Sequence, residues 1–396
     1  MNPGTPRVPT ATPRSPLVTR PLLLRFVSII GSSTSFFLLL SAVPLFARSR
    51  AGDEAAGAST AALMLATVVG ELLTPWFVGR FGYRAALGGG LALLGAATLG
   101  FLACHNIEAI VAICVLRGLG FASTIVAGGA LTASLLPADR RGEGLALVST
   151  VSGVPALVGT PLGVWIAAHI GYQLVIIVGS LSALIAVASV PFLPDRVRTA
   201  GQPVGMLAGL RTPSLARPAI VFATTAVAAG IIVTFLPISV STTGLVTTAL
   251  LVENAACIVI RMLVGRYSDR HHPGQLVLPG LLLSVVGMAA LADRGPVTIL
   301  AGAALFGAGF GITQNATRVL MHMRVSPASY GTVNGIWNLA YDGGMGIGVV
   351  GFGVVANQIG YPAAFAITAV VMLAGLVPWA MDRAPATAPA RAPGAV

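Results

Sequence analysis

Residues 217–238 read RPAIVFATTAVAAGIIVTFLPI, an apolar stretch whose one charge is the arginine at its start. A helix of about 20 apolar residues crosses the hydrocarbon core of a bilayer, which is about 30 Å thick. Backbone N–H and C=O groups find no water there, so such a segment must pair them internally as a helix. Comparable runs recur along the whole 396-residue chain. The sequence therefore predicts an all-α integral membrane protein with many spans.

The composition supports this class and excludes a soluble one. The chain is 56% hydrophobic and 9% charged, with a mean hydropathy of +0.89. A soluble domain has about 25% charged residues. The formal net charge of +11 raises the question of a nucleic-acid partner. We expect none, because the arginines recur between apolar runs instead of clustering in one basic segment.

The apolar runs predict twelve transmembrane helices, which places both termini on the same side of the membrane. They have the length expected of membrane-crossing helices. Their expected ranges are 22–46, 58–78, 85–104, 109–136, 143–168, 173–193, 217–238, 243–264, 276–292, 297–321, 332–356 and 362–381.

The arginines predict the orientation. All the basic residues are arginine, and cytoplasmic loops of membrane proteins carry an excess of positive charge. With the N-terminus inside, only Arg48, Arg50 and Arg294 fall on external segments. We therefore expect a multi-pass protein of the cell inner or plasma membrane with both termini cytoplasmic. The cytoplasmic arginines are then those at 7, 14, 20, 80, 84, 140, 141, 196, 198, 211, 217, 266, 270, 324, 383 and 391.

The longest polar interruption predicts a division into two six-helix halves. It covers residues 194–216, begins Pro194-Asp195-Arg196, and follows the sixth span. We expect a disordered cytoplasmic tail at 1–21, where prolines recur without any acidic residue. The remaining units are an N-terminal half at 22–193, the cytoplasmic linker at 194–216, a C-terminal half at 217–381 and a cytoplasmic tail at 382–396.

A recurring glycine turn indicates an internal repeat. Gly82, Gly171, Gly274 and Gly360 follow spans 2, 5, 8 and 11, and three of them precede tyrosine. Gly274 lies 192 residues after Gly82, and Gly360 lies 189 residues after Gly171. A turn that recurs every three helices lies alternately on opposite faces of the membrane. This pattern predicts inverted three-helix repeats within two parallel halves.

Two cytoplasmic loops carry the resemblance to a known family. The loop after span 2 reads PWFVGRFGYR at 75–84, and the loop after span 8 reads GRYSDR at 265–270. Both resemble the Gly-x-x-x-Asp-Arg-x-Gly-Arg-Arg signature of the major facilitator superfamily, within which the chain is similar to the bacterial drug and sugar efflux branch. The resemblance covers spans 1 to 12. The matching residues are Arg80, Gly82 and Arg84 in the first loop, where Gly79 replaces the aspartate, and Gly265, Arg266, Asp269 and Arg270 in the second.

Span 4 contains Arg117 followed by Gly118-Leu119-Gly120, which resembles a buried arginine of the same family. The resemblance implies a role in proton coupling. On a helix Arg117, Gly120 and Thr124 share one face, so the arginine points away from lipid. A structural arginine near a helix end is the alternative.

Span 5 resembles the antiporter motif of the family, which distinguishes exporters from importers. Small residues spaced four apart allow helices to approach closely, and prolines kink a helix. Packing alone is the alternative explanation. The motif residues are Gly153, Pro155, Gly159, Pro161 and Gly163.

Polar stripes on otherwise apolar spans predict the lining of a central cavity, although each stripe could also join neighbouring helices. Acidic residues within spans are costly unless they are paired or protonated, so they are candidate proton carriers together with Arg117. The cavity candidates are Ser28, Ser32 and Ser35 in span 1, Gln314 and Arg318 in span 10, and Asn334, Asn338 and Tyr341 in span 11. The acidic candidates are Glu71, Glu253 and Asp342.

These features predict a secondary active transporter, with proton-coupled efflux of a small amphipathic compound as the first hypothesis. An uptake symporter of the same fold is the second, and a polytopic membrane enzyme is a remote third. We expect no enzymatic activity, because His-Glu-x-x-His and Gly-x-Ser-x-Gly motifs are missing from the sequence. We expect no cofactor and no metal, since His271-His272 has no further ligands nearby in sequence. The expected partners are a small-molecule substrate, protons and the lipid bilayer, with the protein as a monomer.

Overall fold

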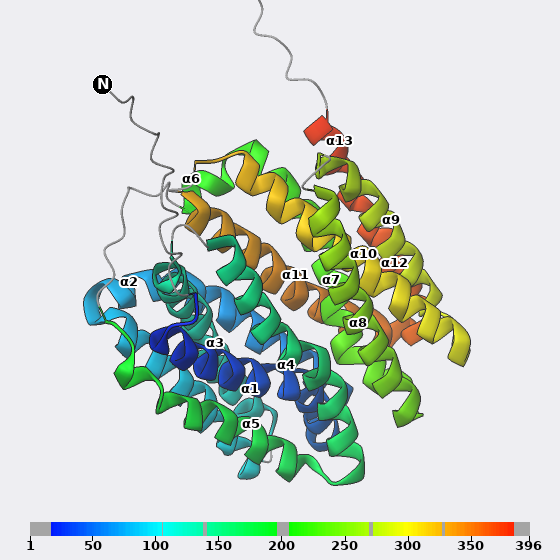
Figure 1. Cartoon of the computed structure of the whole chain (residues 1–396). Helices are drawn as coiled ribbons and strands as arrows, with labels where there is room; N and C mark the ends of the chain where they lie inside the picture. The colour runs from blue at the N-terminus through cyan, green and yellow to red at the C-terminus, as the bar shows by residue number, and fades with distance from the viewer. Residues whose placement is uncertain are drawn as a thin grey trace, which may run out of the picture.

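The computed structural model describes residues 17–104, 106–137, 141–195, 206–268, 272–326 and 329–383, and this part of the chain is helical without any strand (Figure 1). Three short 3₁₀ segments, at 100–102, 190–192 and 373–375, extend or join the α-helices. The α-helices in chain order are α1 (Arg20–Ala51), α2 (Asp53–Leu99), α3 (Ile107–Leu135), α4 (Arg141–His169), α5 (Tyr172–Val187), α6 (Met206–Leu210), α7 (Pro213–Ser239), α8 (Thr243–Ser268), α9 (Gly274–Ala290), α10 (Pro296–Met323), α11 (Tyr330–Ile359), α12 (Tyr361–Met372) and α13 (Leu376–Arg383).

These helices make the twelve expected crossings. Ten apolar helical stretches are long enough to cross a bilayer. One of them, Glu54–Leu102, has 49 residues and is long enough to cross twice at about 1.5 Å per residue. It is interrupted at Gly82, which separates spans 2 and 3. Helix α9 has 17 residues, the lower limit for a span, and supplies the last crossing.

Residues suited to helix starts stand where the helices begin. Helices α1, α7, α10 and α12 each have a proline within their first two positions, where the missing N–H costs nothing. Helix α3 begins after Asn106, whose side-chain oxygen accepts the N–H of Ala109 at 3.0 Å. These local signals explain why the observed starts lie within a few residues of the expected ones.

The glycine turn is found at three of its four expected positions. Gly82, Gly171 and Gly360 have positive φ angles of 87°, 125° and 82°, a conformation that favours glycine. Gly274 does not, so the expectation was wrong there. The chain enters α9 through Pro273, whose backbone is already in the helical region, and no left-handed residue is needed.

The helices form two bundles that lie side by side (Figure 1). In the first bundle α1 packs on α4 and α5, and α2 packs on α3; in the second α7 packs on α11, and α10 packs on α8 and α9. Each bundle has its own apolar core. Phe36, Phe101 and Phe121 belong to the first core, and Phe222 and Phe306 belong to the second.

The bundles touch along a seam made by α2 with α11, α4 with α8, and α1 with α7. We call the helix ends predicted to be cytoplasmic the inner ends and the opposite ends the outer ends. Hydrogen bonds between the bundles lie on the outer part of the seam or near its middle. They join Arg48 to the carbonyl of Ile238, Asn357 to Glu54, Thr234 to Thr60, and Asn254 to Thr160.

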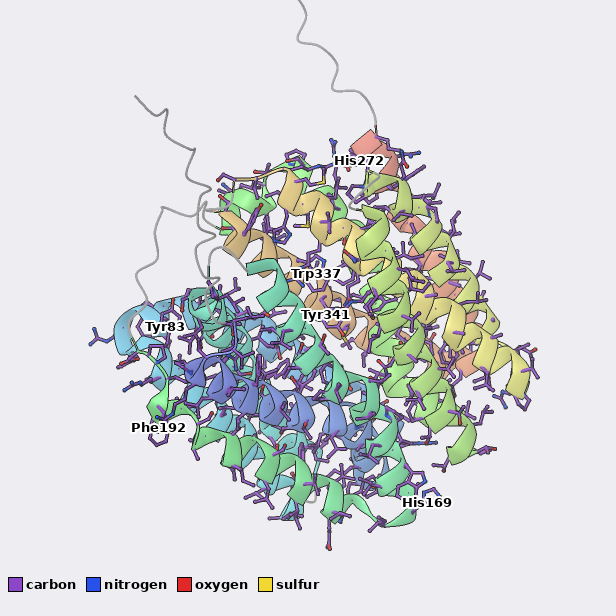
Figure 2. All side chains as sticks on the ribbon, in the orientation of Figure 1. Tyr83, His169, Phe192, His272, Trp337 and Tyr341 are labelled. Carbon is purple, nitrogen blue, oxygen red and sulfur yellow. The ribbon has the colours of Figure 1, made fainter. Side chains whose placement is uncertain are left out.

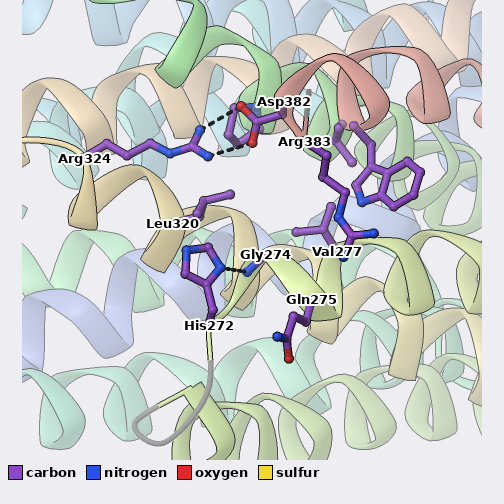
Figure 3. A pocket seen from close by; sticks show the side chains of 11 residues that line it. His272, Gly274, Gln275, Val277, Leu320, Arg324, Asp382 and Arg383 are labelled. Carbon is purple, nitrogen blue, oxygen red and sulfur yellow. Dashed lines mark hydrogen bonds and ion pairs between the residues drawn. The ribbon is translucent and has the colours of Figure 1, made fainter. Parts of the chain in front are cut away.

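The second bundle is tied together at its inner end. Arg324 forms a bidentate ion pair with Asp382, with nitrogen–oxygen distances of 2.9 and 2.7 Å, and donates to the carbonyl of Ser214 at 2.7 Å. These contacts explain why α13 continues to Arg383, beyond the expected span end at 381. A small cavity of about 110 Å³ lies beside the pair, lined in part by His272 and Leu320 (Figure 3).

The orientation yields a test. Single cysteines that replace Ser214 and Asp293, in a background without the three native cysteines, should react with a membrane-impermeant maleimide from opposite sides. We expect position 214 to be labelled only from the cytoplasm and position 293 only from outside, as the arginine distribution requires. Labelling of both positions from one side would contradict the twelve-span topology.

Candidate functional site

Two buried carboxyl groups meet at the middle of the seam. Glu71 of α2 is 4% exposed and Asp342 of α11 is 5% exposed, and the two groups are close enough to interact electrostatically. The side chain of Asn338, one turn from Asp342, is close enough to Glu71 to interact with it. The Oε2 atom of Glu71 is buried without a partner among the described residues. The seam thus joins an acid from each bundle.

A third acid lies beside the other main contact between the bundles. Glu253 of α8 is half-buried. The next residue, Asn254, donates to Thr160 Oγ1 of α4 at 3.0 Å and to the carbonyl of Leu250 at 2.9 Å. A Cβ at Gly307 would overlap the carbonyl oxygen of Glu253, so α10 must carry glycine there to approach α8. The sequence candidates Glu71, Glu253 and Asp342 all lie at or near the seam.

Arg117 lies in the interior of the first bundle and is fully buried. Its Nε donates to Thr98 Oγ1 at 3.0 Å, its Nη2 donates to the carbonyl of Ser35 at 3.3 Å, and its guanidinium lies 5.8 Å from the Phe101 ring centre. Its Nη1 is buried without a partner in the described part of the chain. The polar face of α3 that carries Arg117 therefore points toward α1 and α2 of the first bundle.

The polar stripe of α1 points in the same direction. Ser28, Ser32 and Ser35 are all buried. Arg25, which is also buried, donates to Ser28, Thr132 and the carbonyl of Gly128 on α3. In this structure the stripe joins α1 to α3 and does not line an open space.

The glycine and proline motif of α4 brings this helix into backbone contact with α1. A Cβ at Gly159 would lie 2.8 Å from Cβ of Phe37, and one at Gly163 would overlap the carbonyl oxygen of Leu38. A Cβ at Gly153 would meet nothing within 4 Å. Pro155 and Pro161 are buried within the helix. The outer part of the motif is thus a packing surface, and its inner part borders free space.

The loop after α2's first half is held by its own bundle. The backbone N–H of Arg84 donates to Asp195 Oδ1 at 3.0 Å, and its guanidinium Nε donates to the carbonyl of Leu193. A Cβ at Gly82 would lie 2.6 Å from the same carboxylate oxygen. Arg80 lies over the ring of Phe81 at 5.7 Å.

The second signature loop is described only in part. A Cβ on Gly265 would lie 3.6 Å from the side-chain amide nitrogen of Asn315. Arg266 lies within α8, but the placement of its side chain is outside the described part, and Asp269 and Arg270 lie outside the described residues altogether.

The span 10 and span 11 candidates come together on the second bundle. Arg318 of α10 donates through Nε and Nη2 to Asn334 Oδ1 of α11, at 3.2 and 3.0 Å, and its guanidinium lies 5.1 Å from the Trp337 ring centre. Trp337 stacks on Phe222 with ring centres 4.4 Å apart, and Tyr341 stacks on the same ring at 5.9 Å. Trp337 and Tyr341 lie between the two bundles in the view of Figure 2.

The sequence analysis did not place Arg261 and Asn315 beside these residues of α10 and α11. The side-chain amide of Asn315 donates to the backbone carbonyl of Arg261 at 3.0 Å, and Arg261 is close enough to Tyr341 and Arg318 to affect both electrostatically. A signal was available, because Arg261 lies seven residues after Asn254 and hence on the same face of α8.

Comparison with known proteins resolves the family. The sequence profile of the Major Facilitator Superfamily matches residues 25–238 and again residues 219–395. The chain belongs to the Major Facilitator Superfamily. The first match covers the first bundle and continues through α7, the second covers the rest of the second bundle, and together they include nearly the whole chain, so the chain is a multi-pass membrane transport protein. The predicted fold of two six-helix halves is that of this superfamily.

One curated protein and several solved structures are similar to this chain. A chloramphenicol resistance protein of Streptomyces lividans is 29% identical over 333 residues, which are 79% of this chain and 83% of that protein. The nucleoside transporter NupG has a similar fold with a TM-score of 0.75 at 13% identity, over 92% of this chain and 100% of that one. A D-xylose–proton symporter has a similar fold with a TM-score of 0.72 at 14% identity, over 90% of this chain and 97% of that one.

The packing role of α4 yields a matched pair of substitutions. Gly163→Ala should lower the melting temperature of the detergent-purified protein, because the methyl group would overlap the Leu38 carbonyl; overpacking costs about 1–3 kcal/mol. Gly153→Ala, with open space around it, should leave the melting temperature unchanged or slightly higher. Equal melting temperatures for the two variants would show that α4 does not contact α1 as described.

Proposed function

We propose that this superfamily member is a proton-coupled antiporter that exports a small amphipathic compound by alternating access. The observation that carries the proposal is the Glu71–Asp342 pair. One acid belongs to each bundle, and both are buried where the bundles meet.

The physical argument concerns the cost of charge. A carboxylate buried away from water and without a counter-ion costs several kcal/mol, and taking up a proton removes most of that cost. Two such groups close together add mutual repulsion when both are charged. Loss of protons from the pair therefore favours separation of α2 from α11, and proton uptake favours their contact. Protonation is thereby coupled to the relative position of the bundles.

We infer an inward-facing state, which the distribution of contacts between the bundles supports. The hydrogen bonds identified between the bundles, those of Arg48, Asn357, Thr234 and Asn254, lie on the outer part of the seam or near its middle. Separation of the outer contacts would then open the site to the outside.

Arg117 fits a supporting role in this scheme. Its guanidinium is held by Thr98 and Ser35 without a carboxylate partner in the described part of the chain. A buried cation of this kind rigidifies the first bundle and supplies a fixed positive charge near its centre. We propose that the fixed charge keeps the bundle from binding a second proton.

Export rather than uptake is supported by two observations. The relative from Streptomyces lividans is named for chloramphenicol resistance, and residues 153–163 resemble the antiporter motif. The test is expression in an efflux-deficient bacterial host, followed by growth measurements against a panel of toxic compounds that begins with chloramphenicol. Everted vesicles with an acidic interior then report direction: an antiporter dissipates the pH gradient when its substrate is added outside. Accumulation in right-side-out vesicles, driven by an inward proton gradient, would establish uptake instead.

The acids yield the first functional prediction. Asp342→Asn, Glu71→Gln and Glu253→Gln each remove one titratable group while keeping its shape. We expect the first two to abolish substrate-induced dissipation of the pH gradient, and Glu253→Gln to reduce it, because Glu253 is not paired with an acid of the other bundle. Full proton-coupled export by all three variants would exclude these acids as carriers.

Arg117 yields the second functional prediction. Arg117→Ala should abolish proton-driven transport while the protein still inserts and purifies as a monodisperse species. Arg117→Lys should restore part of it, because lysine keeps the charge but not the forked geometry that reaches Thr98 and Ser35. Transport at the wild-type rate in the alanine variant would contradict the proposed role.

A further inference from the structure

Two arginines of the second bundle border the space between the bundles at its inner side. Arg261 lies two turns from Asn254 on α8, and Asn254 touches α4 of the other bundle. At 1.5 Å per residue, Arg261 is therefore about 10 Å further inward on the same face. Asn334 lies one turn inward from Asn338, which touches α2, and Asn334 holds Arg318. Both guanidinium groups therefore lie just inside the level at which the bundles part.

Among the described residues, neither of these two arginines has an acidic partner. Neither guanidinium has a carboxylate within ion-pair distance in the described part of the chain, where Arg324–Asp382 is the ion pair found. Arg318 donates twice to a neutral amide oxygen, and its side chain is exposed. Arg261 is half-buried and lies close enough to Arg318 for the two positive charges to repel. Two like charges held together in a membrane protein are stabilised by a bound anion.

Neighbouring groups add an aromatic wall and an unused acceptor. Trp337 is buried against the Phe222 ring and the Arg318 guanidinium, and it therefore positions Arg318, while the half-buried Tyr341 stacks on Phe222 beside it. The Oε1 atom of Gln314, one turn from Arg318, is buried without a partner among the described residues.

The facing surface of α4 is small and uncharged. Ser149, Gly153 and Ala156 share the helix face of Thr160 on its inner side, and the space beside Gly153 is open. Within the described side chains of these two facing surfaces, the positive charge is thus on the second bundle.

We propose that the substrate is an aromatic organic anion, whose carboxylate or similar acidic group binds between Arg261 and Arg318 while its ring packs against Tyr341 and the small residues of α4. This assignment rests on the proposed transport function and specifies the chemical class of the substrate. A planar acid accepts two parallel hydrogen bonds from each guanidinium, and the ring fits the aromatic and small-residue surfaces.

Equilibrium binding to the purified full-length protein tests the assignment, with 1-naphthoate as the probe and 1-naphthamide as its neutral isostere. Calorimetry in a neutral maltoside detergent at pH 7.5 should show the acid binding at least about tenfold more tightly than the amide, a difference of about 1.4 kcal/mol. Equal affinities, or no naphthoate binding at millimolar concentrations, would overturn the proposal.

Substitutions locate the binding to these side chains. Arg261→Gln and Arg318→Gln should each weaken naphthoate binding about tenfold and leave naphthamide binding unchanged, because each removes charge-assisted hydrogen bonds. Arg318→Lys should retain part of the preference. Arg383→Gln, an exposed arginine outside the cluster, is the matched control and should bind as the wild type does. If Arg261→Gln does not purify as a monodisperse protein, Arg318→Gln decides, since its side chain is exposed. An undiminished acid preference in Arg318→Gln would overturn the proposal.

Two further arms separate the alternatives. In nanodiscs, naphthoate binding should be the same with phosphatidylcholine alone and with added phosphatidylglycerol; competition by phosphatidylglycerol would assign the site to a lipid headgroup. Binding at equilibrium needs no gradient, so naphthoate binding without proton-driven export refutes the proposed function and leaves this inference intact. Proton-driven export of neutral or cationic compounds that both arginine variants perform normally refutes this inference and leaves the function intact.

Discussion

A bilayer offers buried polar groups no water, so every charge in this protein must be matched by another group of the chain or by something that enters from solution. The two bundles meet this constraint differently. In the first bundle, Arg25 and Arg117 are buried and donate hydrogen bonds to hydroxyl and carbonyl oxygens of neighbouring helices. In the second, Arg261 and Arg318 stand at the border of the space between the bundles without an acidic partner in the described residues. Under the proposed substrate assignment, the first bundle supports the structure and the second binds the substrate.

Glycine determines how closely the helices approach one another. A methyl group at Gly163 would overlap the backbone of α1, and one at Gly307 would overlap the backbone of α8. Such contacts within a bundle leave little freedom for its helices to slide, because small residues bring backbones together over a long stretch. Each bundle is therefore suited to move as a unit, and under the proposed alternating access the relative movement would take place along the seam between the bundles.

The spans and the two-bundle fold could be predicted from the sequence because they depend on local properties: the length of apolar runs, the positions of arginines and the glycines that need positive φ. The site could be predicted only in part. Helical periodicity placed Ser28, Ser32, Ser35 and Arg117 on polar faces, but it could not tell whether such a face meets a neighbouring helix or an open space. The structure places these in the bundle interior and Arg318 with Asn334 at the open side. Gly274 failed as a turn because Pro273 makes a left-handed residue unnecessary.

The outer seam consists in part of single hydrogen bonds between uncharged groups, Thr60 with Thr234 and Thr160 with Asn254. A neutral hydrogen bond contributes only about 0.5–1.5 kcal/mol net, because water replaces it when the partners separate. Such a seam holds the bundles in register, yet each of these hydrogen bonds can be exchanged for hydrogen bonds to water at a small cost in free energy. A fully apolar seam of the same area would remain closed once it had formed. Under the proposed function, threonine and asparagine there would keep the closed position reversible within a turnover.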